Sequence, residues 1–194
     1  MILRRMLWSL GALLISACQP ASTQFLNTNI TGSALKTQVP LTTSDSQTLQ
    51  LNAPNPKQIT AVFFGFTMCP DVCPTTLGNL KLVKQQLGKD ADQLRVILVS
   101  LDPERDTPEI LKQYTQAFGG DFIGAATDLT HTPILAKDLG ITYEKVGSEK
   151  YYMVKHTGNL YLIDRDGRFR VSIPYGTDVK SITYDVKQLI DEKH

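Results

Sequence analysis

Two cysteines, Cys69 and Cys73, are the residues whose type and spacing most clearly suggest chemistry in this sequence. They lie in the segment Cys-Pro-Asp-Val-Cys-Pro, between an apolar run and the expected start of a helix. Free backbone N–H groups and the helix dipole stabilise negative charge at a helix start. We therefore expect both thiols to have lowered pKa values and to form thiolates near neutral pH. Thiolates are nucleophiles and soft metal ligands, so the pair indicates either redox chemistry or metal binding.

The spacing of the pair permits both kinds of chemistry. Redox pairs of the C-x-x-C type have two intervening residues, whereas three residues separate Cys69 from Cys73. On a helix, side chains four positions apart share a face with about 5–6 Å between their Cβ atoms, so two sulfurs can reach one metal ion. The same geometry is compatible with the Cα separation of a disulfide, at most about 6.8 Å. A disulfide across so short a loop adds little stability, so we expect the pair to serve chemistry.

Strands and helices alternate around the cysteine pair. Apolar runs between turn residues predict buried strands at residues 59–64, 94–101 and 122–125, and a weaker signal at 48–51. Apolar periodicity and capping residues predict helices at residues 75–87, 108–118 (capped by residue 106 or 107), 132–140 and 178–190. Residues 144–155 have the character of a loop, and residues 160–163 and 168–173 should form a hairpin around Asp166-Gly167. A βαβ half followed by a ββα half predicts an α/β, thioredoxin-like fold with a mixed central sheet flanked by helices on both faces.

The third candidate ligand is His156, one of three histidines in the chain. His194 is the last residue, and His131 precedes an expected helix, where a solvated or capping role is the simpler interpretation. In a thioredoxin-like fold, the loop before the predicted hairpin passes beside the cysteine-bearing turn, and His156 lies in that loop. Two thiolates and one imidazole form a soft, low-coordinate ligand set that suits Cu(I), whereas zinc would need a fourth ligand or a bound water.

The first 47 residues are expected to lie outside the folded domain. Residues 1–5 are basic and residues 6–15 are apolar, a stretch too short to span a bilayer. Ile15-Ser16-Ala17-Cys18 resembles a bacterial lipobox, with an ordinary secretory signal as the alternative. We predict a lipoprotein signal peptide at 1–17, lipidation of Cys18, a flexible polar tether at 18–47 and the domain at 48–194. This anchor would place the domain on the periplasmic face of a bacterial membrane, inner or outer.

Charge and composition narrow the classes of partner. The chain has 20 basic and 19 acidic residues and 42% hydrophobic residues, which is ordinary for a globular protein. It shows no basic patch and no acidic tail, so nothing suggests nucleic-acid binding. The sequence also lacks a Ser-His-Asp order, a phosphate-binding loop and an H-E-x-x-H motif.

Three segments resemble the Sco/SenC family of copper proteins. The first is Gly65-Phe66-Thr67 before Cys-Pro-Asp-Val-Cys-Pro, and the second is Ser-Leu-Asp-Pro-Glu-Arg-Asp-Thr-Pro at residues 100–108. The third combines His156 with Tyr161-Leu162-Ile163-Asp164 and Asp166-Gly167. The segments occur in the family's order and the resemblance spans residues 59–190.

The resemblance implies a thioredoxin-like fold that binds copper through Cys69, Cys73 and His156. Cu(I) is the favoured ion, and Cu(II) is the alternative. The family serves the assembly of cytochrome c oxidase, so the implied partner is the subunit that bears the dinuclear CuA centre. Other periplasmic copper or thiol-redox proteins are further candidate partners. Thr157 follows His156 where the family commonly has Ser, a difference that keeps the hydroxyl.

Two functions from different classes remain open. The favoured one is a copper metallochaperone, which is not an enzyme and transfers the ion by ligand exchange. The alternative is a thiol–disulfide oxidoreductase that uses Cys69 and Cys73, with the cysteines of the CuA subunit as a substrate. The spacing and His156 favour the metal.

Four further features have simpler interpretations. Met68 is expected to pack in the core rather than to serve as a soft ligand. Asp71 is either a turn residue or a residue that contacts a partner or tunes the site. The acidic and basic residues of 102–106 are expected to form a loop and cap network. Tyr151 and Tyr152 either face a partner or are ordinary strand residues.

Overall fold

The computed structural model describes residues 23–149 and 151–192. The predicted signal peptide, the predicted lipidation site Cys18 and the terminal His194 lie outside the described residues. Among the residues that are described, no helix combines the length and the apolar character needed to cross a membrane.

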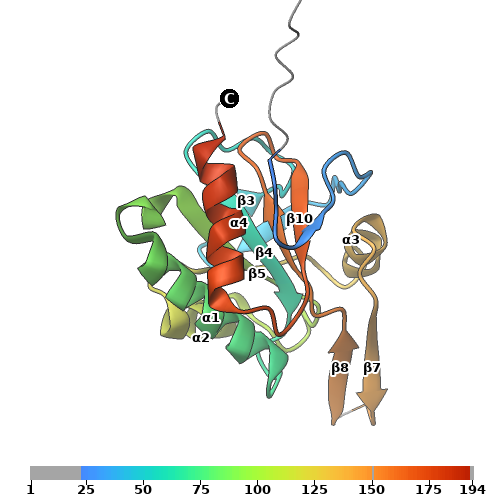
Figure 1. The fold of residues 1–194 in the computed structure, drawn as a ribbon. Helices are drawn as coiled ribbons and strands as arrows, with labels where there is room; N and C mark the ends of the chain where they lie inside the picture. The colour runs from blue at the N-terminus through green and yellow to red at the C-terminus, as the bar shows by residue number, and fades with distance from the viewer. Residues whose placement is uncertain (1–22, 150, 193–194) are drawn as a thin grey trace, which may run out of the picture.

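A mixed sheet of eight strands lies at the centre of the molecule, in the order β1-β10-β9-β4-β5-β6-β2-β3 (Figure 1). Its core is a parallel group made of β4 (Ile59–Gly65), β5 (Leu94–Ser100) and β6 (Ile123–Ala126). On the other side of β4 run the antiparallel strands β9 (Leu160–Ile163) and β10 (Phe169–Ile173). Every residue of β4 is buried, as expected of a strand covered on both faces.

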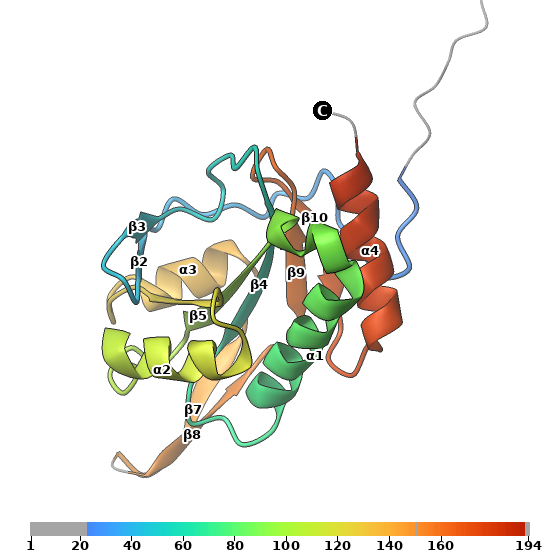
Figure 2. The same ribbon diagram turned by 90° about the vertical axis from the view of Figure 1, so that its left-hand side faces the viewer.

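Helices cover both faces of the sheet. One face carries α1 (Val72–Leu87), α2 (Pro108–Phe118) and α4 (Val179–Asp191), and the opposite face carries α3 (Thr132–Asp138) (Figures 1 and 2). A 3₁₀ helix, η1 (Gly88–Gln93), leads from α1 into β5. The parallel strands β4, β5 and β6 advance in one direction, so right-handed crossovers place α1 and α2 on the same face. The thioredoxin-like fold predicted from the element order is confirmed.

The start of α1 differs from the prediction. The helix begins at Val72, three residues earlier than expected, so Cys73 and Pro74 lie in its first turn. Pro74 is tolerated there because the first N–H groups of a helix have no partner inside the helix. Cys73 is therefore a helical residue, while Cys69 belongs to the loop that leaves β4.

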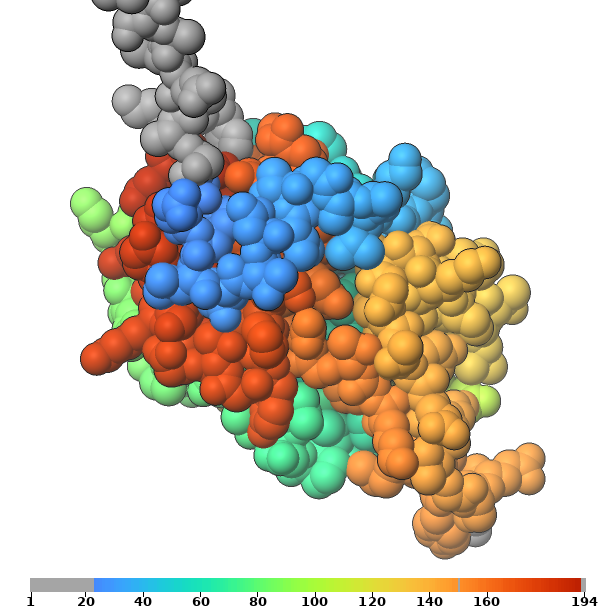
Figure 3. All heavy atoms as spheres, turned by 45° about the vertical axis from the view of Figure 1, so that its right-hand side comes forward, coloured from blue at the N-terminus to red at the C-terminus, as the bar shows by residue number. Residues whose placement is uncertain are grey.

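Residues 144–155 do not form the loop that was expected. They belong to a second sheet, an antiparallel hairpin of β7 (Tyr143–Gly147) and β8 (Tyr152–His156). This hairpin projects from the body of the protein (Figures 1 and 3). Almost all of its residues are exposed or half-buried, so the sequence contains no apolar run that would indicate strands.

The expected flexible tether also differs from the structure over its described part, residues 23–47. The strand β1 (Thr28–Asn29) pairs with β10, and β2 (Leu41–Thr43) pairs with β6 and with β3 (Thr48–Leu49). Asp185 of α4, fully buried, accepts the backbone N–H groups of Leu26 and Asn27. Figure 3 shows this segment lying against the C-terminal helix. Its mostly polar composition concealed the packing, because only isolated apolar side chains such as Val39 and Leu41 are buried.

Removing residues 1–47 should destabilise the domain, whereas removing residues 1–22 should not. Val39 and Leu41 are buried, and burying such side chains contributes about 1.5–3 kcal/mol each, so the longer truncation should cost at least about 3 kcal/mol. Urea unfolding of the two truncated proteins measures the difference. Equal free energies of unfolding would show that residues 23–47 are a tether after all.

Candidate metal centre

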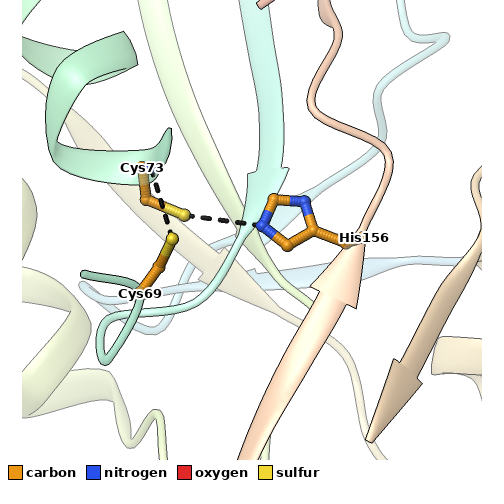
Figure 4. Close-up of side chains that lie close together, drawn as sticks. All are labelled: Cys69, Cys73 and His156. Carbon is orange, nitrogen blue, oxygen red and sulfur yellow. Dashed lines mark hydrogen bonds between the residues drawn. The ribbon is translucent and has the colours of Figure 1, made fainter. Parts of the chain in front are cut away.

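The two cysteines reach one point from neighbouring segments. Cys69 lies in the loop between β4 and α1, and Cys73 lies in the first turn of α1 (Figure 4). The backbone N–H of Cys73 points toward the Sγ atom of Cys69, 3.5 Å away. Both residues are free thiols; Cys73 is fully buried, and Cys69 is half-buried. The pair therefore has one fully buried cysteine and one that is partly accessible.

His156, the last residue of β8, completes the cluster. Its Nε2 atom lies 3.8 Å from the Sγ atom of Cys73. The three potential ligand atoms lie within 4.8 Å of one another, and Figure 4 shows the side chains converging. No other group of three Cys, His, Asp or Glu residues with converging ligand atoms occurs in residues 23–149 and 151–192. The tertiary structure thus brings together the three residues selected from the sequence.

The imidazole of His156 is oriented for binding through Nε2. Its Nδ1 atom lies 3.0 Å from the carbonyl oxygen of Thr157. A carbonyl can only accept, so Nδ1 carries the proton and the lone pair of Nε2 faces the sulfurs. The rings of Phe63 and Phe66 contact the imidazole edge-on, each with a centroid separation of 5.9 Å. These contacts fix both the tautomer and the plane of the ring.

Burial lowers the pKa of His156 from its ordinary value, while the hydrogen bond to Thr157 opposes that shift. The neutral imidazole is the form with a free lone pair. Near neutral pH the ring is therefore in the state that a metal ion requires.

The expectation that both thiols have lowered pKa values is wrong for Cys73. Burial raises the pKa of this thiol, and that effect outweighs the hydrogen bond from the backbone of Phe66, which lowers it. The free energy needed to remove water from a thiolate exceeds the stabilisation that the start of the helix provides. In the metal-free protein Cys73 is a neutral thiol.

Gly65 makes room for the Cys73 sulfur. A Cβ atom at position 65 would lie 2.5 Å from Sγ of Cys73 and 2.9 Å from the ring of Phe63. Both separations are shorter than a real Cβ contact allows. Only glycine at the end of β4 is compatible with a sulfur in this position.

The loop before Cys69 is held by Asp106. Its buried carboxylate accepts hydrogen bonds from the backbone N–H and the hydroxyl of Thr67, and from the hydroxyl of Ser100. The cap of α2 is Thr107, whose side chain accepts from the N–H of Ile110. The predicted loop and cap network is confirmed, and it connects residues 100–107 to the cysteine loop.

Other sequence expectations have mixed outcomes. Met68 is 60% exposed beside Cys69, so the expectation that it packs in the core is wrong. Asp71 accepts a hydrogen bond from the hydroxyl of Tyr175. His131 pairs with Asp128 at the surface, as a solvated residue. The roles of Phe63 and Phe66 were missed, because aromatic residues in an apolar run give no signal beyond core packing.

The variant Gly65→Ala should displace the Cys73 sulfur. Forcing a methyl group into a packed site costs about 1–3 kcal/mol, and the displaced thiol should react faster with iodoacetamide under native conditions. Mass spectrometry of the alkylated peptides and urea unfolding measure the two effects. The matched control is Gly78→Ala in α1, where the added Cβ meets no atom within 4 Å. Unchanged Cys73 reactivity in Gly65→Ala would contradict this packing.

The sequence is similar to a group of related proteins. A family model described as SCO1/SenC matches residues 30–191. A protein of Stutzerimonas stutzeri, provisionally named a copper-binding protein, is 36% identical over 134 residues, which is 68% of this chain and 66% of the relative. A SCO2-like protein of Rickettsia prowazekii is 32% identical over 114 residues, 57% of this chain and 56% of the relative. The matched regions thus span less than two thirds of these relatives.

Solved structures show the same fold. ScoI of Bradyrhizobium japonicum with copper bound is 32% identical, with a TM-score of 0.73 over 80% of this chain and 99% of that structure. ScoI of Arabidopsis thaliana with copper bound is 26% identical, with a TM-score of 0.74 over 82% of this chain and 100% of that structure. With the family model covering most of the chain, this protein belongs to the SCO1/SenC family.

Proposed function

We propose that this protein binds one copper ion through the Sγ atoms of Cys69 and Cys73 and the Nε2 atom of His156. The observation that carries the proposal is the convergence of these three atoms within 4.8 Å. Two sulfurs and one imidazole nitrogen form a soft donor set that fits copper. The low number of ligands favours Cu(I), and Cu(II) is the alternative. The copper-bound ScoI structures of two relatives support the same choice of metal.

The burial of the ligands suggests where copper enters and leaves. Cys73 is fully buried, whereas Cys69 and His156 are both half-buried, so solvent reaches the site from the side of these two ligands. An incoming thiolate can reach a three-coordinate ion from this side without first displacing a ligand. Such a site suits a protein that passes its ion on.

We infer that the protein is a copper metallochaperone rather than an enzyme. The Sco/SenC resemblance supports delivery to the CuA-bearing subunit of cytochrome c oxidase. The lipobox-like sequence before Cys18 supports a lipid anchor on the periplasmic face of a bacterial membrane. The delivery partner and the lipid anchor are both inferred from sequence patterns.

A second candidate function is thiol–disulfide exchange by the same pair. The observation that favours it is that two free thiols converge at the start of α1, one of them accessible. Cys69 would attack a partner disulfide and form a mixed disulfide, and Cys73 would then resolve it. The protein's pair becomes a disulfide and the partner gains two thiols, with two electrons and two protons transferred. The oxidised pair cannot bind copper, so the two functions exclude each other at any moment.

The reduced protein lacking residues 1–22 should hold one copper ion per chain against a competing Cu(I) chelator. Cys69→Ser and Cys73→Ser should each abolish retention, because each removes a thiolate ligand. Loss of an outer hydrogen-bonding partner weakens metal binding by about 10–100-fold. His156→Ala removes a ligand itself, so it should weaken copper binding by more than this. Metal analysis and chelator competition provide the measurements, and His131→Ala is the matched surface control.

Two results would count against this assignment. Unchanged affinity in His156→Ala would exclude the three-ligand site. A folded protein that retains no copper but has a readily reduced disulfide would favour the oxidoreductase.

The apparent affinity for Cu(I) should rise with pH between 6 and 8. Cys73 is protonated in the metal-free protein, because burial raises its pKa, and copper must displace that proton. Each proton released makes the apparent association constant grow about tenfold per pH unit. Burial also lowers the pKa of His156, so its ring is more fully neutral at a given pH than an ordinary imidazole. Competition titrations at several pH values measure the slope, and a flat profile would contradict the protonated state of Cys73.

A further inference from the structure

The hairpin that carries His156 is not part of the central sheet. The strands β7 and β8 pair only with each other among the described strands. Backbone pairing therefore does not fix the angle at which the hairpin meets the rest of the domain. Some other contact must hold His156 beside the cysteines.

Arg105 provides such a contact through Tyr152, the first residue of β8. The guanidinium of Arg105 stacks on the tyrosine ring, with Cζ 3.8 Å from the ring centroid. Its Nη1 atom donates a hydrogen bond of 3.0 Å to the carbonyl oxygen of Tyr152. The side chain of Arg105 thus contacts both the ring and the backbone of Tyr152.

Asp102, in the body of the domain, binds both Arg105 and Tyr152. Its fully buried carboxylate forms an ion pair with Nε of Arg105 and accepts a hydrogen bond of 2.8 Å from the hydroxyl of Tyr152. Hydrogen bonds to a buried charge are stronger than neutral ones. We call the trio of Asp102, Arg105 and Tyr152 the hairpin clamp.

The clamp acts on His156 along the strand. Successive side chains of a strand alternate between its faces, so Tyr152, Val154 and His156 project from the same face of β8. Val154 is buried, and the other two are half-buried. Fixing Tyr152 against the domain therefore sets the direction in which this face, with His156 at its end, meets the cysteines.

Arg105 is also connected to His156 through the ring of Phe66. Cζ of Arg105 lies 5.8 Å from the centroid of the buried Phe66 ring. The same ring packs edge-on against His156 at an interplanar angle of 86°. Arg105 thus supports both the strand that carries the imidazole and the aromatic surface on which the imidazole rests.

We propose that Arg105 is a positioning residue for His156, and that the hairpin clamp holds Nε2 beside Cys73 before copper arrives. The proposal rests on the proposed copper site. A ligand that is held in place before binding loses less conformational freedom when the ion binds. Lysine cannot replace arginine here, because it has neither a planar group to stack nor a fork of donors.

The first test uses the metal-free protein. Arg105→Lys should speed hydrogen exchange of the β8 amides by about tenfold or more, as expected when an element loses the contact that holds it to the domain, while β4 amides keep their rates. The imidazole nitrogen signals of His156 should shift toward those of a mixture of tautomers. The matched control is Lys155→Met, because Lys155 is an exposed cation of the same strand, β8. Unchanged exchange of β8 in Arg105→Lys would overturn the proposal.

The second test asks whether Arg105 acts through His156. Arg105→Lys should weaken Cu(I) binding about 10–100-fold, as loss of an outer-shell partner does. In a His156→Ala background the same substitution should change the affinity by less than about twofold, because coupled residues are not additive. Equal losses in the two backgrounds would show that Arg105 does not act through the imidazole.

Two further variants keep the tests decisive. If Arg105→Lys fails to fold because Asp102 is left poorly paired, Tyr152→Leu removes the hairpin side of the clamp and leaves the Asp102–Arg105 pair intact. Tyr152→Leu should then reproduce the faster β8 exchange, and normal β8 exchange in this variant would overturn the proposal. If His156→Ala alone leaves the copper affinity unchanged, the copper site fails, and the exchange data still decide the clamp.

Discussion

The burial of the Cys73 sulfur against Gly65 is the contact on which the rest of the site depends. The sulfur occupies the space that a side chain at the end of β4 would need, and this fixes how α1 leaves the strand. Around the sheltered Cys73 lie the half-buried Cys69 and His156, and His156 approaches the sulfur of Cys73 from β8. One tight contact between a glycine and a thiol thus places the sulfur around which the other two candidate ligands gather.

This burial has an electrostatic consequence that suits an ion carrier. Taking a thiolate and an imidazolium out of water costs free energy even when the two charges pair, and the structure avoids both charges. Burial raises the pKa of Cys73 and lowers that of His156, so both groups are neutral without metal. In the proposed cycle, copper takes the place of the Cys73 proton, and the metal-free site holds neither a Cys73 thiolate nor a His156 imidazolium.

The loop at residues 101–107 joins the two halves of the site. Asp106 holds Thr67, in the segment that leads to Cys69, while Asp102 and Arg105 hold Tyr152, in the strand that leads to His156. Cys73 and His156 are more than eighty residues apart in the sequence. A segment with no candidate ligand of its own therefore contacts both of the segments that carry them.

The sequence by itself determined the central strands, the helices and the three candidate ligands, because apolar periodicity, capping residues and donor chemistry are local properties. It failed at the β7–β8 hairpin, whose strands bury almost no apolar side chains, and at residues 23–47, where isolated apolar side chains and pairing with distant strands hold the segment. It also failed at Met68 and at the pKa of Cys73, since exposure is decided by what the rest of the chain covers. Only the tertiary structure decided these points, because burial and long-range pairing depend on residues far away in the sequence.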